Sequence, residues 1–374
     1  MKLVALALGS LVALLGVVVL YSWLRPNRAE VDPALRIEHW PIVSDGQHNS
    51  NTDMIAWRDG FLLVHATSPW HLGSTRSRLL VKHSSDDGRS WETLARLGVP
   101  GHDIRDPKLA VIDGTLFLYA LPNLGRMATP IGTLLATSRD GRDWTPFEPV
   151  GPEGWLFWRP KTHDGRTWYV SAYWKDHGRS ILLRSDDGRA WQQVSEIHAG
   201  DGNDETAIEF LPDGRLVATA RLEVTPDNVL GNDDAGTAIA VADPPYTEWS
   251  QRRSSSTRLD GPVLFRHEGR VFAVARWQPP PHGGLWKLGG ALARKRTGLY
   301  RVEPERLVYL GDLPSAGDTS YAGVVLRDGA LFTEYYTSRI DRDYPWLLGM
   351  FLPTELRMAR IPLEALESVS DAHP

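Results

Sequence analysis

An acidic residue followed by glycine recurs six times along the chain, each time between two apolar runs. Asp-Gly between alternating apolar runs is the strongest short signal of a β-hairpin, because its tight turn needs positive φ angles. Successive copies lie between 49 and 60 residues apart, which predicts one structural unit repeated six times. The glycines are Gly60, Gly114, Gly165, Gly214, Gly269 and Gly329.

A second turn motif falls between the first three pairs of these hairpins. The sequence SSDDGRSW (84–91) returns in altered form as TSRDGRDW (137–144) and RSDDGRAW (184–191). Each repeat is therefore expected to hold two hairpins, which make four strands. Six four-stranded units close radially into a β-propeller, an architecture that leaves only short, protected sheet edges.

The two ends of the repeat region are expected to join. The run LRIEHWPIV (35–43) precedes the first hairpin, and ELRMARIPLEAL (355–366) follows the last one. In many propellers the first strand completes the last blade, so we expect these runs to pair. Almost no apolar period of 3.6 residues is visible beyond the N-terminal segment. The prediction is one all-β domain over residues 35–370.

The N-terminal segment differs from the rest of the chain. Residues 3–24 carry no charged side chain, and Arg25 and Arg28 follow them. A helix of that length spans the hydrocarbon core of a bilayer, about 30 Å thick. We expect a retained transmembrane anchor over residues 1–28 and a polar linker over 29–34, with the propeller on the extracytoplasmic side. A cleaved signal peptide is the alternative.

Composition excludes several classes of function. The net charge is -5 at pH 7, so no basic surface indicates a nucleic-acid partner. The chain has no Cys, which excludes disulfides, thiol catalysis and Cys-ligated metals. Its 12 His are scattered without the spacing of metal ligands. We therefore expect no catalytic metal and no cofactor, whereas a structural metal stays open.

Propeller geometry indicates where a binding or catalytic site would lie. If the Asp-Gly turns share one face, the starts of the inner strands and the ends of the second strands meet at the other. Ionisable side chains that converge on one channel mouth are typical of a functional site. The second-strand candidates are Arg221 and Arg276. The inner-strand candidates are Asn51, Asp53, Arg105, Asp106, Arg159, Lys161, Glu205, Asp260 and Tyr321.

The second turn motif resembles a known family signature. SSDDGRSW fits the Asp-box pattern Ser-x-Asp-x-Gly-x-Thr/Ser-Trp in full, whereas Arg139 and Arg184 make the other two copies degenerate. Tandem Asp boxes resemble the sialidase (neuraminidase) superfamily, whose fold is a six-bladed propeller. The resemblance covers the chain after its N-terminal segment. It implies a glycoside hydrolase that releases a terminal acidic sugar, and hence a glycan partner.

Two segments resemble the catalytic stretches of that family. NDETAIEFLPDGRLVATAR (203–221) implies that Glu205 is the base and Arg221 a carboxylate-binding arginine. DTSYAGVVLRDGALFTEYY (318–336) implies that Tyr321 is the nucleophile, and Arg276 is the implied second arginine. A tyrosine suits this substrate because its carboxylate would repel an anionic nucleophile. A neighbouring carboxylate must then take the phenolic proton.

Two parts of the family's pattern are missing here. The family's blade-one Arg-Ile-Pro triplet has no counterpart in HNSNTDMIAW (48–57), which lacks arginine. The family's acid Asp also has no counterpart, because the corresponding loop HATSPWHLGSTRS (65–77) contains no acidic residue. We expect His71 to act as the acid and Arg105 to supply the third guanidinium, with Arg159 as a further substrate-binding arginine.

Two alternative functions stay open at this point. HDIRDPKLAVIDG (102–114) resembles the Arg-Asp-Pro stretch of furanosidase propellers, which use three carboxylates. That resemblance implies Asp53 as nucleophile or base, Asp106 as the second carboxylate and Glu205 as acid. Those propellers, however, have five blades and no Asp boxes. The other alternative is a non-catalytic propeller that binds a glycan or a protein.

Overall fold

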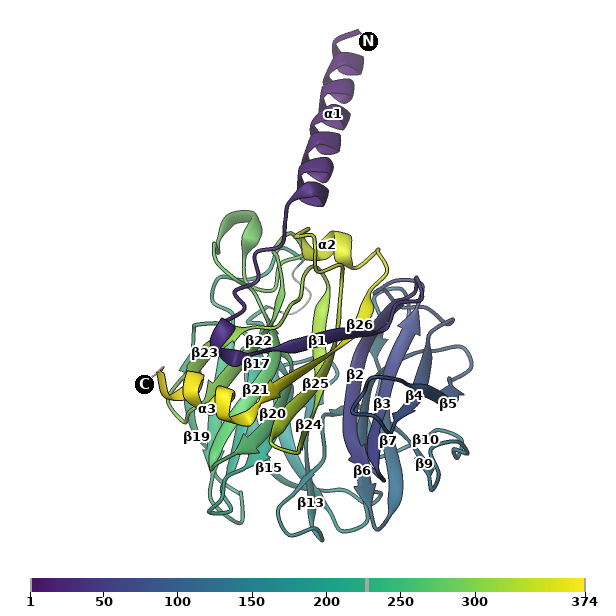
Figure 1. Ribbon diagram of the computed structural model, residues 1–374, viewed down its shortest axis with the longest axis vertical. Coiled ribbons are helices and arrows are strands. Elements are labelled where there is room, and N and C mark those ends of the chain that lie inside the picture. Colours follow the sequence, from purple (N-terminus) through teal and green to yellow (C-terminus); the bar gives the residue numbers. More distant parts are fainter. Residues whose placement is uncertain (1, 226–228, 373–374) are drawn as a thin grey trace.

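The computed structural model describes residues 2–225 and 229–372. Its body consists of six antiparallel sheets whose first strands pack side by side around a central axis. A helix, α1 (Lys2–Leu24), projects from one end of this body (Figure 1). The predicted all-β propeller of six blades, each built on four strands, is confirmed.

The blades follow one another along the chain. Blade one contains β2 (His48–Trp57), β3 (Gly60–Ser68), β4 (Arg78–Ser84) and β5 (Glu92–Leu97). Blade two contains β6 (Asp103–Ile112), β7 (Thr115–Leu124), β8 (Thr129–Pro130), β9 (Leu134–Ser138) and β10 (Glu148–Pro149). Blade three contains β11 (Trp155–Phe157), β12 (Lys161–Thr162), β13 (Trp168–Trp174), β14 (Arg179–Ser185) and β15 (Gln192–Ala199).

The second half of the ring repeats this arrangement. Blade four contains β16 (Asn203–Phe210), β17 (Leu216–Leu222), β18 (Gly236–Ala242) and β19 (Ser250–Ser254). Blade five contains β20 (Asp260–His267), β21 (Arg270–Trp277), β22 (Arg296–Val302) and β23 (Leu307–Asp312). Blade six contains β24 (Thr319–Arg327), β25 (Ala330–Thr337), β26 (Glu355–Pro362) and β1 (Glu38–Val43).

The ring is closed by the strand nearest the N-terminus, as predicted. Strand β1 pairs antiparallel with β26, with Trp40 opposite Met358. In Figure 1 the purple β1 lies beside the yellow β26. A helix that the sequence analysis did not predict, α3 (Leu363–Ala372), packs against η1 (Pro33–Leu35) through the buried Leu35 and Leu366. Both chain ends of the propeller are thereby fixed to one another.

Removal of residues 1–43 is expected to prevent cooperative folding, whereas removal of residues 1–24 is not. The longer truncation deletes β1 and leaves β26 as an unpaired edge, while the shorter one removes only α1. Thermal unfolding followed by tryptophan fluorescence would compare the two. A sharp transition in the chain that starts at residue 44 would contradict the closure role of β1.

One apolar cluster connects the blades across the centre of the ring. It contains buried residues from every blade, so each blade contributes to a shared core rather than to six separate ones. Burial of such side chains contributes about 25 cal/mol per Å² of apolar surface. One member from each blade in turn is Met54, Leu121, Trp158, Val217, Ala273 and Phe332.

All six acidic-residue and glycine pairs lie in the turn between the first two strands of a blade. Both residues have positive φ in three of them, as a primed turn requires: Asp113–Gly114, Glu268–Gly269 and Asp328–Gly329. Gly60 departs from this pattern, because its φ is not positive and Arg58 takes the positive value instead. A Cβ on Gly60 would lie 1.8 Å from the Ser84 carbonyl oxygen, so close strand approach requires this glycine.

The serine-containing turn of blade one is held by a local hydrogen-bond network. The Gly88 amide donates to Ser84 Oγ at 2.9 Å, and the Ser90 amide donates to Asp86 Oδ1 at 2.8 Å. The Trp91 indole donates to the Gly88 carbonyl oxygen at 3.0 Å. The turn thus fixes the indole ring against its own backbone.

The corresponding turns of blades two and three form the same bonds with one residue fewer. Asp140 and Asp187, each directly before the glycine, accept the backbone N–H groups. Arg139 and Arg184 therefore do not occupy bonding positions of these turns. Both turns keep the hydrogen-bond network, although their sequences depart from that of the blade-one turn. The hydroxyls come from Ser138 and Ser185.

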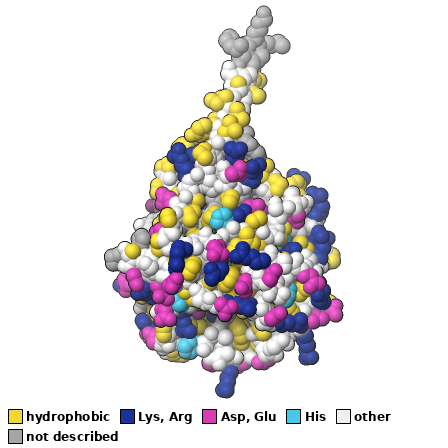
Figure 2. All heavy atoms as spheres, in the orientation of Figure 1, with side chains coloured by type: hydrophobic (Ala, Val, Ile, Leu, Met, Phe, Trp, Pro, Cys, Tyr) yellow, Lys and Arg dark blue, Asp and Glu magenta, His cyan; other side chains and the backbone are white. Residues whose placement is uncertain are grey.

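The segment after α1 is fixed to the propeller rather than free. The Asn27 side chain donates to the carbonyl oxygens of Ser315 and Ile340, and the Asp312 amide donates to the Glu30 carbonyl oxygen. The predicted linker over residues 29–34 is therefore docked on blades five and six. Figure 2 shows apolar side chains along α1 and basic side chains where it meets the body.

The prediction of a transmembrane helix is not supported. Within residues 2–225 and 229–372, no helix is both long and apolar enough to cross a membrane. Attachment to a membrane and the extracytoplasmic location stay predictions.

Two long loops cover the end of the channel opposite the Asp-Gly turns. The blade-five loop contains η2 (Gly284–Trp286), and the blade-six loop contains α2 (Trp346–Gly349). The Trp346 amide donates to the Ala293 carbonyl oxygen at 2.9 Å, so the two loops pack on each other. This contact brings the Trp346 indole over the end of the channel, where the candidate residues lie.

Candidate functional site

A β-bulge interrupts the inner strand of five blades close to its start. At each bulge the pairing with the second strand shifts and the residue at the bulge adopts a positive φ, as does Ser320 beside Tyr321. A bulge redirects the side chain of the extra residue, and positive φ outside glycine costs about 1 kcal/mol or more. The residues are Asn51 (φ 46°), Asp106 (50°), Glu205 (29°), Gly261 (59°) and Tyr321 (50°). Three of the predicted site residues are therefore held in strained backbone.

Tyr321 and Glu205 meet across the ring. The Tyr321 hydroxyl donates to Glu205 Oε1, and Oε2 accepts from the Gly261 amide at 2.7 Å. Burial raises the pKa of Glu205 to about 7, although Arg221, 2.9 Å from Oε2, opposes the rise. Burial and the Glu205 charge hold the pKa of Tyr321 well above its usual value. A phenol and a carboxyl poised near neutral pH thus share one hydrogen bond.

Three arginines surround a single carboxylate beside this pair. Asp260 lies 2.7 Å from Arg258 Nε, 3.0 Å from Arg276 Nε and 3.5 Å from Arg221 Nη1. Arg221 also forms a two-bond ion pair with Asp204. The guanidinium of Arg276 lies 5.3 Å from the centre of the Tyr321 ring. Guanidinium groups and carboxylates therefore alternate next to the phenol.

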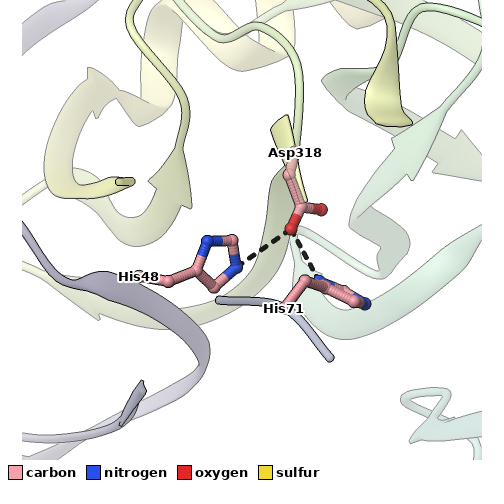
Figure 3. Close-up of side chains that lie close together, drawn as sticks. All are labelled: His48, His71 and Asp318. Carbon is pink, nitrogen blue, oxygen red and sulfur yellow. Dashed lines mark hydrogen bonds and ion pairs between the residues drawn. The ribbon is translucent and has the colours of Figure 1, made fainter. Parts of the chain in front are cut away.

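His71 and Asp318 lie at the same channel mouth. His71 Nδ1 lies 2.6 Å from Asp318 Oδ2, and His48 Nε2 lies 3.1 Å from the same oxygen (Figure 3). The other oxygen accepts from the Trp346 indole at 2.7 Å and from the Tyr336 hydroxyl at 3.0 Å. Burial lowers the pKa of His71, and Asp318 opposes that effect. For Asp318, burial opposes ionisation, but the two imidazoles outweigh it and hold the pKa well below its usual range.

Two predicted site residues neutralise each other inside the channel. Asp53 Oδ1 lies 2.8 Å from Arg159 Nε, and Oδ2 accepts from the Leu109 amide at 2.7 Å. Arg159 donates its remaining bonds to the carbonyl oxygens of Pro262 and Ala322. Both side chains are buried and join blades one, two, three, five and six. Asp53 as nucleophile or base and Arg159 as a substrate contact would each have to give up these bonds, and both roles stay predictions.

Arg105 and Asp106 are neighbours in sequence with different surroundings. Arg105 donates to Asp103 Oδ2 at 2.6 Å and to the His71 carbonyl oxygen at 2.9 Å, so it supports the loop that bears His71. Asp106, on a bulge, accepts from the Asn51 side chain and remains half-buried. Burial lowers the pKa of the nearby Lys108 to about 8.

Several site residues were missed by the sequence analysis. Arg258 lies two residues before the strand-start Asp260, and Asp318 lies three before Tyr321. Both residues lie upstream of the turn glycines Gly269 and Gly329, so a longer count back from these glycines would have reached them. No pattern signalled His48, because its role depends on a contact with a residue 270 positions away. Trp346 lies in a loop whose path the repeats do not determine.

A second group of ionisable side chains lies beside Arg221. His177 Nδ1 lies 3.3 Å from Glu223 and 3.5 Å from Asp204. Burial lowers the pKa of His177, but the two carboxylates prevail and raise it to about 9. Since Arg221 and a protonated His177 already neutralise these acids, the group is an ion-pair network.

Comparison with known proteins supports the fold. No protein-family model and no curated protein matches the chain. Among solved structures, a protein of unknown function from Dyadobacter fermentans aligns with a TM-score of 0.64 at 16% identity, over 87% of this chain and 99% of that one.

Sialidases are also among the similar structures. A Trypanosoma rangeli sialidase mutant that displays trans-sialidase activity aligns with a TM-score of 0.64 at 14% identity, over 92% of this chain and 61% of that one. The endosialidase of phage phi92 aligns with a TM-score of 0.63 at 10% identity, over 87% and 69%. This chain therefore spans about three fifths of the trypanosomal protein. At these identities the likeness shows the propeller fold alone.

Proposed function

We propose that the chain is a sialidase-like glycoside hydrolase that releases a terminal acidic sugar. The observation that carries the proposal is the hydrogen bond between the Tyr321 hydroxyl and Glu205 at the channel mouth, beside three arginines. The serine-containing turns act as Asp boxes in this proposal, and the glycan is the partner. Similar structures include sialidases bound to sialic acid and to the inhibitor DANA, which supports a sugar ligand.

Tyr321 acts as the nucleophile and Glu205 as its base. Glu205 takes the phenolic proton while the phenolate oxygen bonds to the anomeric carbon and the bond to the leaving oxygen breaks. A phenol is otherwise a weak nucleophile near neutral pH, because its usual pKa is about 10. Water then displaces Tyr321 from the sugar and loses its proton to the neutral His71, while Glu205 returns its own proton to the phenolate.

Arg221, Arg258 and Arg276 bind the substrate carboxylate. Asp260 uses the Nε atoms of Arg258 and Arg276, which fixes the planes of both guanidiniums. Terminal guanidinium nitrogens suit a carboxylate through paired hydrogen bonds. Arg258 fits the third position better than Arg105, since Arg105 is engaged by Asp103 and a backbone carbonyl.

In its doubly protonated form, His71 donates its Nε2 proton to the leaving oxygen and becomes a neutral imidazole that stays bonded to Asp318 through Nδ1. Asp318 accepts from Nδ1 and so orients the ring, while the His71 side chain keeps 21% exposure at the channel mouth. This arrangement places a proton donor on the loop where the family's acid would lie. Its partner Asp318 comes from the segment that bears the nucleophile.

Hydrolysis of a fluorogenic sialoside by the full chain tests the proposal. Release of the fluorophore above the rate of a heat-denatured sample is the expected result. Absence of turnover with both α2,3- and α2,6-linked substrates would overturn the hydrolase assignment.

The rate is expected to fall with acidification through pH 7. Glu205 has a raised pKa of about 7, so its basic form exists above that pH and is lost below it. The value of kcat/KM should decrease about tenfold for each unit below the pKa of an essential base. A pH profile between 4.5 and 8.5 measures this. An acid limb centred near 4.5 would show that Glu205 is not the base.

A non-catalytic glycan-binding propeller is the second candidate. It is favoured by the pairing of each arginine with a carboxylate of the chain itself, which leaves less positive charge for a substrate. Binding of a sialoside in calorimetry, with no turnover, would support it. The furanosidase alternative is weaker, because both oxygens of Asp53 are engaged.

A further inference from the structure

His48, His71 and Asp318 form a cluster whose bonding is incomplete. The three residues come from the start of β2, the blade-one loop and the residue before β24. Their candidate ligand atoms all lie within 4.8 Å of one another. In Figure 3 both imidazole rings turn a nitrogen toward one carboxylate.

The two ring nitrogens of His48 face different groups. Its Nδ1 lies 3.0 Å from the Leu352 carbonyl oxygen, so Nδ1 must carry the proton. Nε2, the other ring nitrogen, is directed at Asp318 Oδ2, 3.1 Å away. Nε2 is buried and has no hydrogen-bond partner among the described residues. A bond between these two atoms requires a cation between them, either a proton on Nε2 or a metal ion.

We propose that His48 Nε2, His71 Nδ1 and Asp318 Oδ2 bind a divalent transition metal ion, with Zn²⁺ as the best fit. Imidazole nitrogen and carboxylate oxygen are the ligands that Zn²⁺ accepts besides thiolate. Three protein ligands leave a fourth position for water. His71, 21% exposed, lies on the solvent side, whereas His48 and Asp318 are fully buried.

The surroundings of the cluster suit a metal site. A metal-binding histidine usually donates its other nitrogen to a carbonyl or a carboxylate, as His48 does to Leu352. The second oxygen of Asp318 is fixed by Trp346 and Tyr336. The His71 amide donates to the Met350 carbonyl oxygen at 2.8 Å, so its loop is fixed as well. Binding would release the Nδ1 proton of His71 and replace its bond to Asp318.

Zinc binding to the full chain, purified without a histidine tag and treated with chelator, tests the proposal. Calorimetric titration with ZnCl2 should show one ion bound per chain. Co²⁺ in place of Zn²⁺ should give the visible absorption bands of a four-coordinate site. Both readouts are independent of substrate, so failure here would leave the proposed hydrolase untouched, and the reverse holds too.

Variants assign the bound ion to this cluster. His48→Gln and His71→Gln should each weaken Zn²⁺ binding by at least about 100-fold, since loss of a ligand costs more affinity than loss of a group that only orients a ligand. His102→Gln is the matched control, because that histidine is half-buried and its Nδ1 lies 3.0 Å from the Pro100 carbonyl oxygen, outside the cluster. Near-ultraviolet circular dichroism verifies folding, and the partly exposed His71 gives a second variant if His48→Gln misfolds. Absence of Zn²⁺ binding would overturn the proposal. The proposal would also be overturned if His177→Gln lost Zn²⁺ binding while His48→Gln and His71→Gln kept it.

Discussion

Replacement of Tyr321 by phenylalanine is expected to remove hydrolysis while the protein stays folded. The substitution deletes only the hydroxyl that Glu205 accepts, and the ring keeps its edge contacts with Trp158 and Tyr336. Loss of a nucleophile lowers kcat by roughly 10³-fold to 10⁶-fold in enzymes where it has been removed. Steady-state kinetics on a fluorogenic sialoside measures the effect, with thermal unfolding as the check on folding.

Tyr246→Phe is the matched control for this experiment. Its hydroxyl is also buried and donates to the Gly214 carbonyl oxygen at 2.8 Å, on the face that bears the Asp-Gly turns. This variant should keep the activity of the unaltered chain. A Tyr321→Phe protein with full activity would exclude the tyrosine mechanism and move the reaction to the carboxylates.

Replacement of Arg221 by methionine is expected to have the largest effect on stability. Arg221 lies between Asp204, Glu205, Glu223 and Asp260, all of them buried or nearly so. Loss of one partner from a buried ion pair costs about 3 to 5 kcal/mol, because charges remain buried without compensation. Denaturant unfolding followed by tryptophan fluorescence should show a lower midpoint at pH 7.

Arg215→Met provides the comparison on the same hairpin. Arg215 pairs with Asp213 at 2.8 Å, but both side chains are exposed. An exposed pair of this kind contributes about 0 to 1 kcal/mol. If both variants unfold at the same denaturant concentration, Arg221 is not the residue that holds the acidic cluster together.

Local signals in the sequence predicted the framework of the molecule. The spacing of Gly114, Gly214 and the other turn glycines defined six blades, because each hairpin is a short-range structure with its own turn chemistry. Counting from those glycines also placed Arg221 and Arg276 opposite the inner-strand starts, as the pairing of β16–β17 and β20–β21 confirms. The sequence analysis therefore located the channel mouth.

The detailed bonding of the site depends on features that carry no local signal. The bulges at Asp106, Glu205 and Tyr321 occur without glycine, so no residue type announces them. The pairing of Asp53 with Arg159 depends on side chains that reach across the ring from different blades. Such contacts depend on the curvature of the closed ring, and this curvature cannot be predicted from single segments of the sequence.

The closure of the ring by β1 has a consequence for the order of events during synthesis. Strand β1 leaves the ribosome first, yet its partner β26 follows roughly 300 residues later. At 5 to 20 residues per second, β1 waits about 15 to 60 s for that partner. Five blades can form in this interval, but the sixth cannot be completed. The nascent protein therefore carries an unsatisfied strand edge that chaperones or other chains can capture until its last segment is released.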